Sequence, residues 1–346
     1  MALTLLLAGF ALASAAVWFA GIHLSDATDV LSMRLGLGEA VGGAILLAIA
    51  TNLPEIAIVT TAAIGHDLGI ATGNILGGIA VQTVVLAVLD VFGSRGAPLT
   101  YRAASLPLVI EGGLVVALLA IVVDGTRLSP DAIRFRLTVP AVLIFVVWLC
   151  GLWLLRLAQR GLPWHEQGNP PDGQEHPRGH KTKMVEQRGP STRRASVTFG
   201  AAALVTLGGG IALERLSESI STRIGLSGVL FGATVLAAAT ALPEVSTGLE
   251  SLKLGDYQLA VSDIFGGNAF LPVLFLPATL ISGSAVLPQA HASDVYLTAL
   301  GILLTVIYMG GLLFRPQRQW ARFGPDSLAV VALYVLGIVG LAFVAQ

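Results

Sequence analysis

Two glutamates lie in strongly apolar sequence, and each directly follows a proline. Glu55 closes the stretch ATNLPE after Pro54, and Glu244 closes ATALPE after Pro243. A proline lacks a backbone N–H and clashes with the preceding turn, so carbonyls one turn earlier lose their helical partners. Freed carbonyls beside a carboxylate offer hard oxygen ligands, which suit Ca²⁺, Na⁺ or a proton better than soft metals. Two such carboxylates facing each other would need a cation between them or at least one bound proton.

The surrounding composition is that of an integral membrane protein. Of the 346 residues, 55% are hydrophobic and only 12% are charged, whereas a soluble domain carries about 25% charged residues. Apolar runs near the length of about 20 residues that crosses a bilayer predict ten transmembrane helices. The ten runs are 2–22, 36–64, 68–93, 104–123, 137–157, 196–214, 225–252, 256–283, 293–314 and 326–345.

A polar segment divides these spans into five and five. It covers residues 158–195 and is poor in apolar residues and rich in helix breakers, which predicts a disordered connector. We therefore expect one five-span half at 1–157 and a second at 196–346. With the connector in the cytoplasm, fifteen Lys and Arg residues fall on the cytoplasmic side and five outside. This bias predicts that both termini lie outside.

The two glutamate motifs are copies of one another. Without gaps, residues 36–55 align with residues 225–244 and are identical at eleven of twenty positions; the glycine pair 77–78 then aligns with 266–267. Because an odd number of spans separates the copies, they enter the membrane from opposite sides. The sequence thus predicts an all-α polytopic membrane protein of two inverted five-helix repeats, an architecture typical of secondary transporters.

The T-x-L-P-E motif with a following G-G patch, present in both halves of a ten-span chain, resembles the alpha repeats of the cation/calcium exchanger superfamily. That superfamily includes sodium/calcium and calcium/proton exchangers. The resemblance implies that Glu55 and Glu244 bind the transported ion and that Thr51 and Thr240 supply backbone carbonyls. It also implies alternating access, in which the first and sixth spans slide against the other eight.

The chain departs from the sodium/calcium exchanger pattern at four positions. Gly78 and Gly267 stand where those exchangers have serine, and Gln82 and Leu271 stand where they have Asn or Asp. Those groups help form the sodium sites, and proton-coupled members tend to carry a glutamine at the position of Gln82. We therefore expect a cation/proton antiporter with Ca²⁺ as the cation. A sodium/calcium exchanger and a Na⁺/H⁺ antiporter are the alternatives.

Other polar residues in the apolar spans are further candidates. Asp263, aligned with Asn74, is expected to contact the ion, because ionisable residues inside a membrane are functional by default. Asn268 lies on the same span and offers a further polar ligand. For Asn74 and Gln82, ion contact and a bond between helices are equal alternatives. Glu111 is either a proton relay or a protonated group bonded to a neighbouring helix.

Near the span ends, acidic residues have a simpler explanation. Asp90 lies close to the end of the third span, where a charged side chain ordinarily reaches to the interface.

Other functional classes fit the pattern less well. A channel would need a continuous polar lining along a pore. An enzyme would need an asymmetric group of catalytic residues, such as an H-E-x-x-H motif. In this sequence the polar residues are instead concentrated in two duplicated blocks. A net charge of −1 predicts no nucleic-acid partner. We expect no cofactor, inorganic cations as substrates, the lipid bilayer as partner and a bacterial inner membrane as location.

Overall fold

The chain is helical in the computed structural model, which describes residues 2–34, 48–66, 68–93, 96–103, 105–158, 161–163, 191–226, 228–253 and 255–344. The helices of the first half are α1 (Leu3–Arg34), α3 (Leu53–Gly65), α4 (Leu68–Gly93), α5 (Leu99–Ala103), α6 (Leu106–Gly125) and α7 (Val139–Ala158). Those of the second half are α9 (Thr192–Ile224), α10 (Gly228–Phe231), η2 (Gly232–Leu236), α11 (Ala237–Thr240), α12 (Leu242–Lys253), α13 (Tyr257–Phe270), η3 (Leu271–Leu274), α14 (Phe275–Ser282), η4 (Leu287–Gln289), α15 (Ala292–Phe314) and α16 (Pro325–Val344). The predicted connector lies mostly outside these described residues.

Eight helical segments of the described chain are long and apolar enough to cross a membrane. They correspond to eight of the ten expected spans. The other two expected spans are the ones that carry the glutamate motifs. The described part of 36–64 begins at residue 48 and contains α3, only 13 residues long. The run 225–252 is divided into α10, η2, α11 and α12.

The long helices α1 and α9 exceed their predicted bounds. We expected spans at 2–22 and 196–214, but α1 continues to Arg34 and α9 reaches Ile224. No glycine or proline follows the apolar runs before Gly36 and Gly225, so nothing local ends either helix earlier. Gly225 ends α9 with a left-handed backbone, φ 72°.

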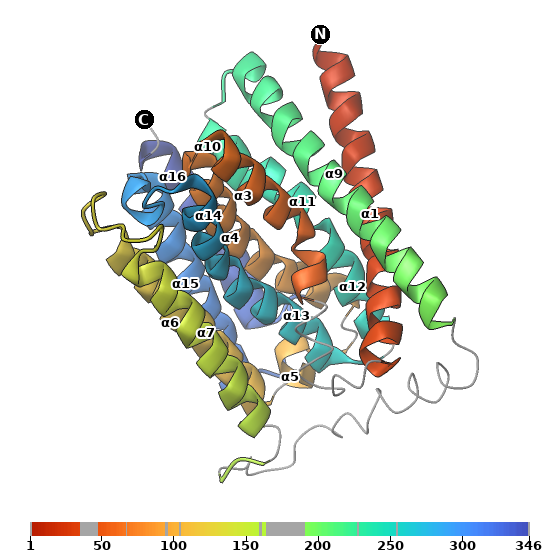
Figure 1. Cartoon of the computed structure of the whole chain (residues 1–346). Helices are drawn as coiled ribbons and strands as arrows, with labels where there is room; N and C mark the ends of the chain where they lie inside the picture. The colour runs from red at the N-terminus through yellow and green to blue at the C-terminus, as the bar shows by residue number, and fades with distance from the viewer. Residues whose placement is uncertain are drawn as a thin grey trace.

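Each broken segment packs against the long helix of the opposite half. α3 contacts α9, and α12 contacts α1, while α1 and α9 lie side by side at one edge of the molecule (Figure 1). A Cβ atom added at Gly210 would lie 2.9 Å from Cα of Pro54, and one at Gly21 would lie 2.9 Å from Cα of Pro243. Both long helices therefore need glycine where they touch a proline. The two contacts are related by the same offset as the two glutamates.

A second backbone device also occurs in both halves. Tight turns at 134–137 and 320–323 precede α7 and α16, and each is closed by backbone hydrogen bonds between its first and last residues. The two central residues of both turns have positive φ although none is glycine. The duplication thus extends from the motifs to the last helix of each half.

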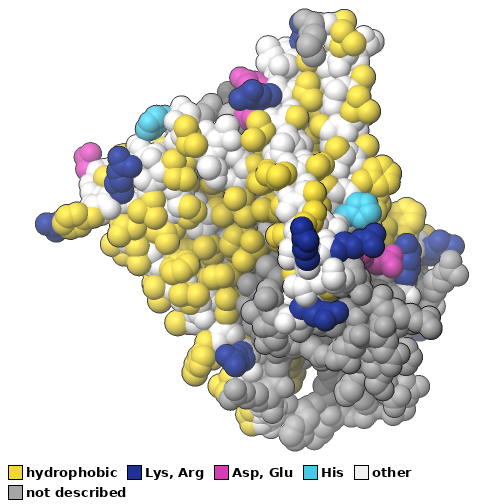
Figure 2. All heavy atoms as spheres, turned by 45° about the vertical axis from the view of Figure 1, so that its right-hand side comes forward, with side chains coloured by type: hydrophobic (Ala, Val, Ile, Leu, Met, Phe, Trp, Pro, Cys, Tyr) yellow, Lys and Arg dark blue, Asp and Glu magenta, His cyan; other side chains and the backbone are white. Residues whose placement is uncertain are grey.

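The outer surface is suited to lipid. Hydrophobic side chains cover a broad, continuous area in Figure 2, and Lys and Arg gather beside it. Large apolar side chains are exposed along the helices that close each half, such as Trp153 on α7 and Phe343 on α16. The start of α1 and the end of α16 lie toward the same end of the bundle (Figure 1), as an even number of membrane crossings requires.

Candidate cation site

Both motifs place a carboxylate in the first turn of a helix that begins at a break. In the first half, Asn52 leaves helical geometry (φ −86°, ψ 17°) and α3 then starts with Pro54 and Glu55 in its first turn. In the second half, Ala241 interrupts the chain between α11 and α12, and Glu244 is in the first turn of α12. Proline is favoured in the first turn of a helix, and the positive end of the helix dipole favours a carboxylate there.

The two carboxylates are buried in the same region of the bundle. Glu55 is 1% exposed and Glu244 is 0% exposed. Glu244 lies within electrostatic range of Glu55 and of the buried Asp263 on α13. The side chain of Thr240, which belongs to the second half, is next to Glu55. The inverted repeats therefore bring together groups that are far apart in the sequence.

Gln82 joins the two halves. From α4 its Nε2 donates to Oδ1 of Asn52 (3.1 Å) and to Oε1 of Glu244 (3.2 Å), and all three side chains are buried. Asn52 in turn donates to the carbonyl of Ala48, at 2.7 Å, beside the break. Asn52 was not among the site residues predicted from the sequence. The signal was present, because Asn52 interrupts the alignment of the two motifs by standing opposite Ala241.

The second half adds two polar groups from α13. Thr247, one turn beyond Glu244 on α12, donates a short hydrogen bond to Asp263. Asn268 donates from Nδ2 to the hydroxyl of Thr83 on α4, at 3.1 Å. Both bonds cross between helices, so they hold the α13 side chains in position.

Several acceptor atoms at the site have no donor. No hydrogen bond of normal geometry from a described residue reaches the following buried oxygens: both carboxylate oxygens of Glu55, Oε2 of Glu244, Oε1 of Gln82 and Oδ1 of Asn268. Buried polar atoms are almost always satisfied in native structures. These atoms are all oxygens, so the group that would complete them is a hard cation or a proton.

The arrangement does not resemble a transition-metal centre. In the described part of the chain, no three His, Cys, Asp or Glu side chains are grouped as metal ligands. The available ligand atoms are the carboxylate oxygens of the two glutamates and the neutral amide and backbone oxygens around them. Thr51 and Thr240 add hydroxyl groups. Both threonines are buried, and their hydroxyls donate to the carbonyls of Ala48 and Ala237, respectively. Such a mixed oxygen set is typical of Na⁺ or Ca²⁺ rather than Zn²⁺.

The four positions that depart from the sodium/calcium exchanger pattern form two contacting pairs. A Cβ atom at Gly267 would lie 2.8 Å from Nδ2 of Asn52 and 3.4 Å from Oε1 of Gln82. A Cβ atom at Gly78 would lie 3.5 Å from Cδ1 of Leu271. At both places the longer residue of one half occupies space beside a glycine of the other. The departures from the exchanger pattern therefore occur as two pairs of neighbouring residues, Gly267 with Gln82 and Gly78 with Leu271.

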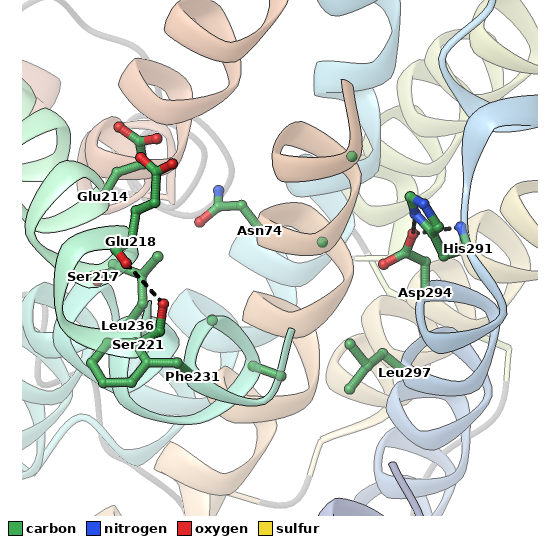
Figure 3. Close-up of a pocket in the computed structure, with 14 residues that line it drawn as sticks. Asn74, Glu214, Ser217, Glu218, Ser221, Phe231, Leu236, His291, Asp294 and Leu297 are labelled. Carbon is green, nitrogen blue, oxygen red and sulfur yellow. Dashed lines mark hydrogen bonds and ion pairs between the residues drawn. The ribbon is translucent and has the colours of Figure 1, made fainter. Parts of the chain in front are cut away.

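Asn74 lies away from this hydrogen-bonded cluster. It is in the wall of a cavity of about 360 Å³ between α4, α9, η2 and α15. Figure 3 shows its side chain pointing toward Glu214 and Glu218 of α9, while Asp294 of α15, which also lines the cavity, is drawn on the other side of α4. Leu236, also in the wall, is one helical turn before Thr240. The cavity thus approaches the buried cluster from one end of the bundle.

Glu111 is also outside the cluster. Its Oε1 accepts a hydrogen bond from the hydroxyl of Ser262 at 2.9 Å, which joins α6 to α13. Ser262 is adjacent in sequence to Asp263. The contact is consistent with the helix-bonding alternative and leaves the relay a prediction.

The fold and the buried oxygen cluster define a polytopic membrane transporter of small cations. The chain belongs to the sodium/calcium exchanger protein family, whose model matches residues 5–158 and 195–343. This family membership also places the protein among ion exchangers and not among enzymes.

Individual relatives agree with this placement. "Inner membrane protein YrbG" of Escherichia coli (strain K12) is 24% identical over 299 residues, which are 85% of this chain and 84% of that protein. A structure of the sodium-calcium exchanger NCX_Mj aligns with a TM-score of 0.63 at 17% identity, covering 98% of this chain and 99% of the other. A structure of the H⁺/Ca²⁺ exchanger CAX aligns at 0.65 with 13% identity, covering 98% and 88%. The structural likenesses establish the fold.

Proposed function

We propose that the protein is a Ca²⁺/H⁺ antiporter that works by alternating access around Glu55 and Glu244. The observation that carries the choice of proton is the position of Gln82. Its Nε2 donates to Glu244 and to Asn52, so Gln82 contacts the central carboxylate from the position where sodium-coupled exchangers carry Asn or Asp and proton-coupled members tend to carry glutamine. On the opposite side, Leu271 offers no ligand.

The exchange follows from charge balance. Two carboxylates buried together require either a cation or protons, and no ion pair in the described chain joins either glutamate to a basic side chain. Binding of Ca²⁺ between Glu55 and Glu244 would satisfy the open oxygens, with carbonyl oxygens near Thr51 and Thr240 and with Asn268 completing the shell. Release of Ca²⁺ would leave the pair to take up protons. One site then alternates between the two cargoes.

Access from one side is supported by the cavity in Figure 3. We place the connector 158–195 in the cytoplasm and both termini outside, in a bacterial inner membrane, in line with the name of the Escherichia coli relative. In this orientation the end of α9 and the start of α15, which line the cavity, are on the outer side. Leu236 lies in the wall of the cavity and is one helical turn before Thr240. Sliding of α1 and α9 would open the opposite side.

The test is ion flux into proteoliposomes that contain the purified protein. Vesicles with an acidic interior should take up ⁴⁵Ca²⁺ from a sodium-free bath as protons leave. Glu244→Gln should abolish the uptake, while the matched control Glu250→Gln, on the same helix but exposed, should retain it. Uptake that requires internal Na⁺ instead of internal acid would refute proton coupling and establish the sodium alternative. Lack of calcium flux under either gradient would remove Ca²⁺ as the substrate.

A further inference from the structure

A second pair of buried carboxylates lies at the other end of α4. Asp90 was expected to reach the membrane interface, but it is fully buried. Its Oδ1 accepts the backbone N–H of Leu99 (2.7 Å) and its Oδ2 accepts that of Gly324 (2.6 Å). Both oxygens act as acceptors, so Asp90 ties the end of α4 to the starts of α5 and α16.

Asp326 faces the same place from the first turn of α16. It is 7% exposed, and neither carboxylate oxygen accepts a hydrogen bond of normal geometry from a described residue. The buried Thr100 hydroxyl and the backbone N–H groups of Asp326 and Ser327 lie next to this carboxylate, and Asp90 is within electrostatic range. The carboxylate of Asp326 is thus surrounded by groups that do not close a hydrogen bond of normal geometry with it, in a region from which water is largely excluded.

Gly324 lies next to both carboxylates. An atom at the Cβ position of Gly324 would lie 2.6 Å from Oδ1 of Asp326 and 3.1 Å from Oδ2 of Asp90. The Ser327 side chain lies next to Asp90 and is 2.8 Å from the hydroxyl of Tyr308. No ion pair in the described chain connects a basic side chain to either aspartate. Beside Gly324 and Pro98, the two carboxylates therefore lie near one another with hydroxyl groups around them.

We propose that Asp90 and Asp326 form a second cation site, separate from the glutamate pair, which takes a hard cation such as Na⁺ or Ca²⁺. Two carboxylates at such close range repel unless a positive charge lies between them. The surrounding donors are carboxylate and hydroxyl oxygens, the ligands that these cations prefer. Without the cation, two buried carboxylates would lie close together with no positive charge beside them, a costly arrangement.

The second site has no counterpart in the first half of the chain. The turn before α7 repeats the turn before α16, but Pro140 stands in α7 where α16 carries Asp326. In the proposed orientation the site is on the cytoplasmic side, at the far end of the helix that carries Gln82. The proposal itself requires neither that orientation nor any transport activity.

The experiment measures equilibrium binding of ⁴⁵Ca²⁺ and ²²Na⁺ to the purified full-length protein in detergent. A background variant with Glu55→Gln and Glu244→Gln removes the central pair. It should still bind about one cation per chain, and adding Asp326→Asn should lower that binding at least tenfold. Asp131→Asn, an equivalent change at an exposed position, should leave it unchanged.

A shared proton is the competing account of the same pair. It predicts that the background variant binds neither cation, and that result would overturn the proposal, as would residual binding insensitive to Asp326→Asn. If Asp326→Asn does not give a monodisperse protein, Thr100→Val decides, because it removes one neutral oxygen and should raise the dissociation constant several-fold. Unchanged affinity in Thr100→Val would then contradict the site. Loss of flux in the central variants has no bearing on these outcomes.

Discussion

The two halves of the molecule use the same backbone device with different side chains. Each half breaks a helix before a proline and places a glutamate in the next first turn, and each break packs on a glycine of the other half's long helix. The polar groups around the glutamates differ. The first half supplies the amides of Asn52 and Gln82, whereas the second supplies Asp263, Thr247 and Asn268.

This difference shows what the duplication preserves. The repeated backbone positions the carboxylates, and it tolerates little change because both long helices meet a proline at a glycine. The side chains around the glutamates differ between the halves: Gln82, which lies near Gly267, aligns with Leu271, which lies near Gly78. Breaking one half at a time therefore tests whether the site works as one unit, and the following variants are ordered by the size of the expected effect.

Removing either glutamate should abolish exchange. Glu55→Gln and Glu244→Gln each leave one buried carboxylate without its partner, so the site loses half of the negative charge that holds Ca²⁺. We expect ⁴⁵Ca²⁺ uptake at the level of empty vesicles in both variants, with Glu250→Gln active. Retained uptake in one variant would show that the halves are not equivalent in ion binding.

Replacing Gln82 by the residue of the other half should weaken the site strongly. Gln82→Leu removes the donor to Glu244 and Asn52, and a hydrogen bond to a charged group contributes about 1.5–3 kcal/mol. We expect an apparent calcium affinity lower by roughly ten- to a hundredfold, measured from the concentration dependence of ⁴⁵Ca²⁺ uptake. Since Leu271 already stands at the matching position, Leu271→Met is the control. An unchanged affinity in Gln82→Leu would show that the hydrogen bonds of Gln82 do not support ion binding at Glu244.

Replacing a glycine of α1 or α9 by alanine should destabilise the protein only where that glycine touches a proline. Gly210→Ala places a methyl group against the backbone of Pro54, whereas Gly208→Ala meets nothing within 4 Å. Overpacking of this kind costs about 1–3 kcal/mol, so we expect a lower thermal midpoint and slower exchange for Gly210→Ala only. Gly21→Ala should behave like Gly210→Ala, because it meets Pro243 in the same way. Different effects of the two would mean that the packing is less symmetric than the distances indicate.

The smallest effect is expected for Thr247→Val. This change removes the short hydrogen bond to Asp263 but keeps the volume of the side chain. Loss of one bond contributes about 1 kcal/mol, so apparent calcium affinity should fall by only a few-fold. Thr222→Val, at an exposed position on α9, is the control. A loss as large as that of Gln82→Leu would move Asp263 to the centre of the site.

Much of the architecture was predictable because its signals are local. Hydropathy predicted eight of the spans that the structure contains, and the alignment of the motifs predicted the inverted repeat of the family fold. The prolines marked where the helices of both motifs are interrupted, since a missing N–H acts within one turn. The bounds of α1 and α9 were wrong because hydropathy reports the membrane and does not report where a helix ends.

The surroundings of the glutamates needed the tertiary structure. Asn52 was missed, Asn74 lies in the wall of a cavity, and Asp90 is buried. Each of these outcomes depends on which face of a helix meets a helix far away in the sequence, and an apolar span gives little periodicity from which to read that face.

The amino-acid sequence by itself determined that this chain crosses the membrane as a duplicated bundle and that each half carries one glutamate at a helix break. Composition, hydropathy and proline act through short-range physics, so they can be read without a fold. Only the tertiary structure decided that Gln82 bridges the halves and that Asp326 lies near Asp90. It also decided that Gly267 lies near Gln82 and that Gly78 lies near Leu271. Those contacts join segments from opposite ends of the chain, and packing alone determines them.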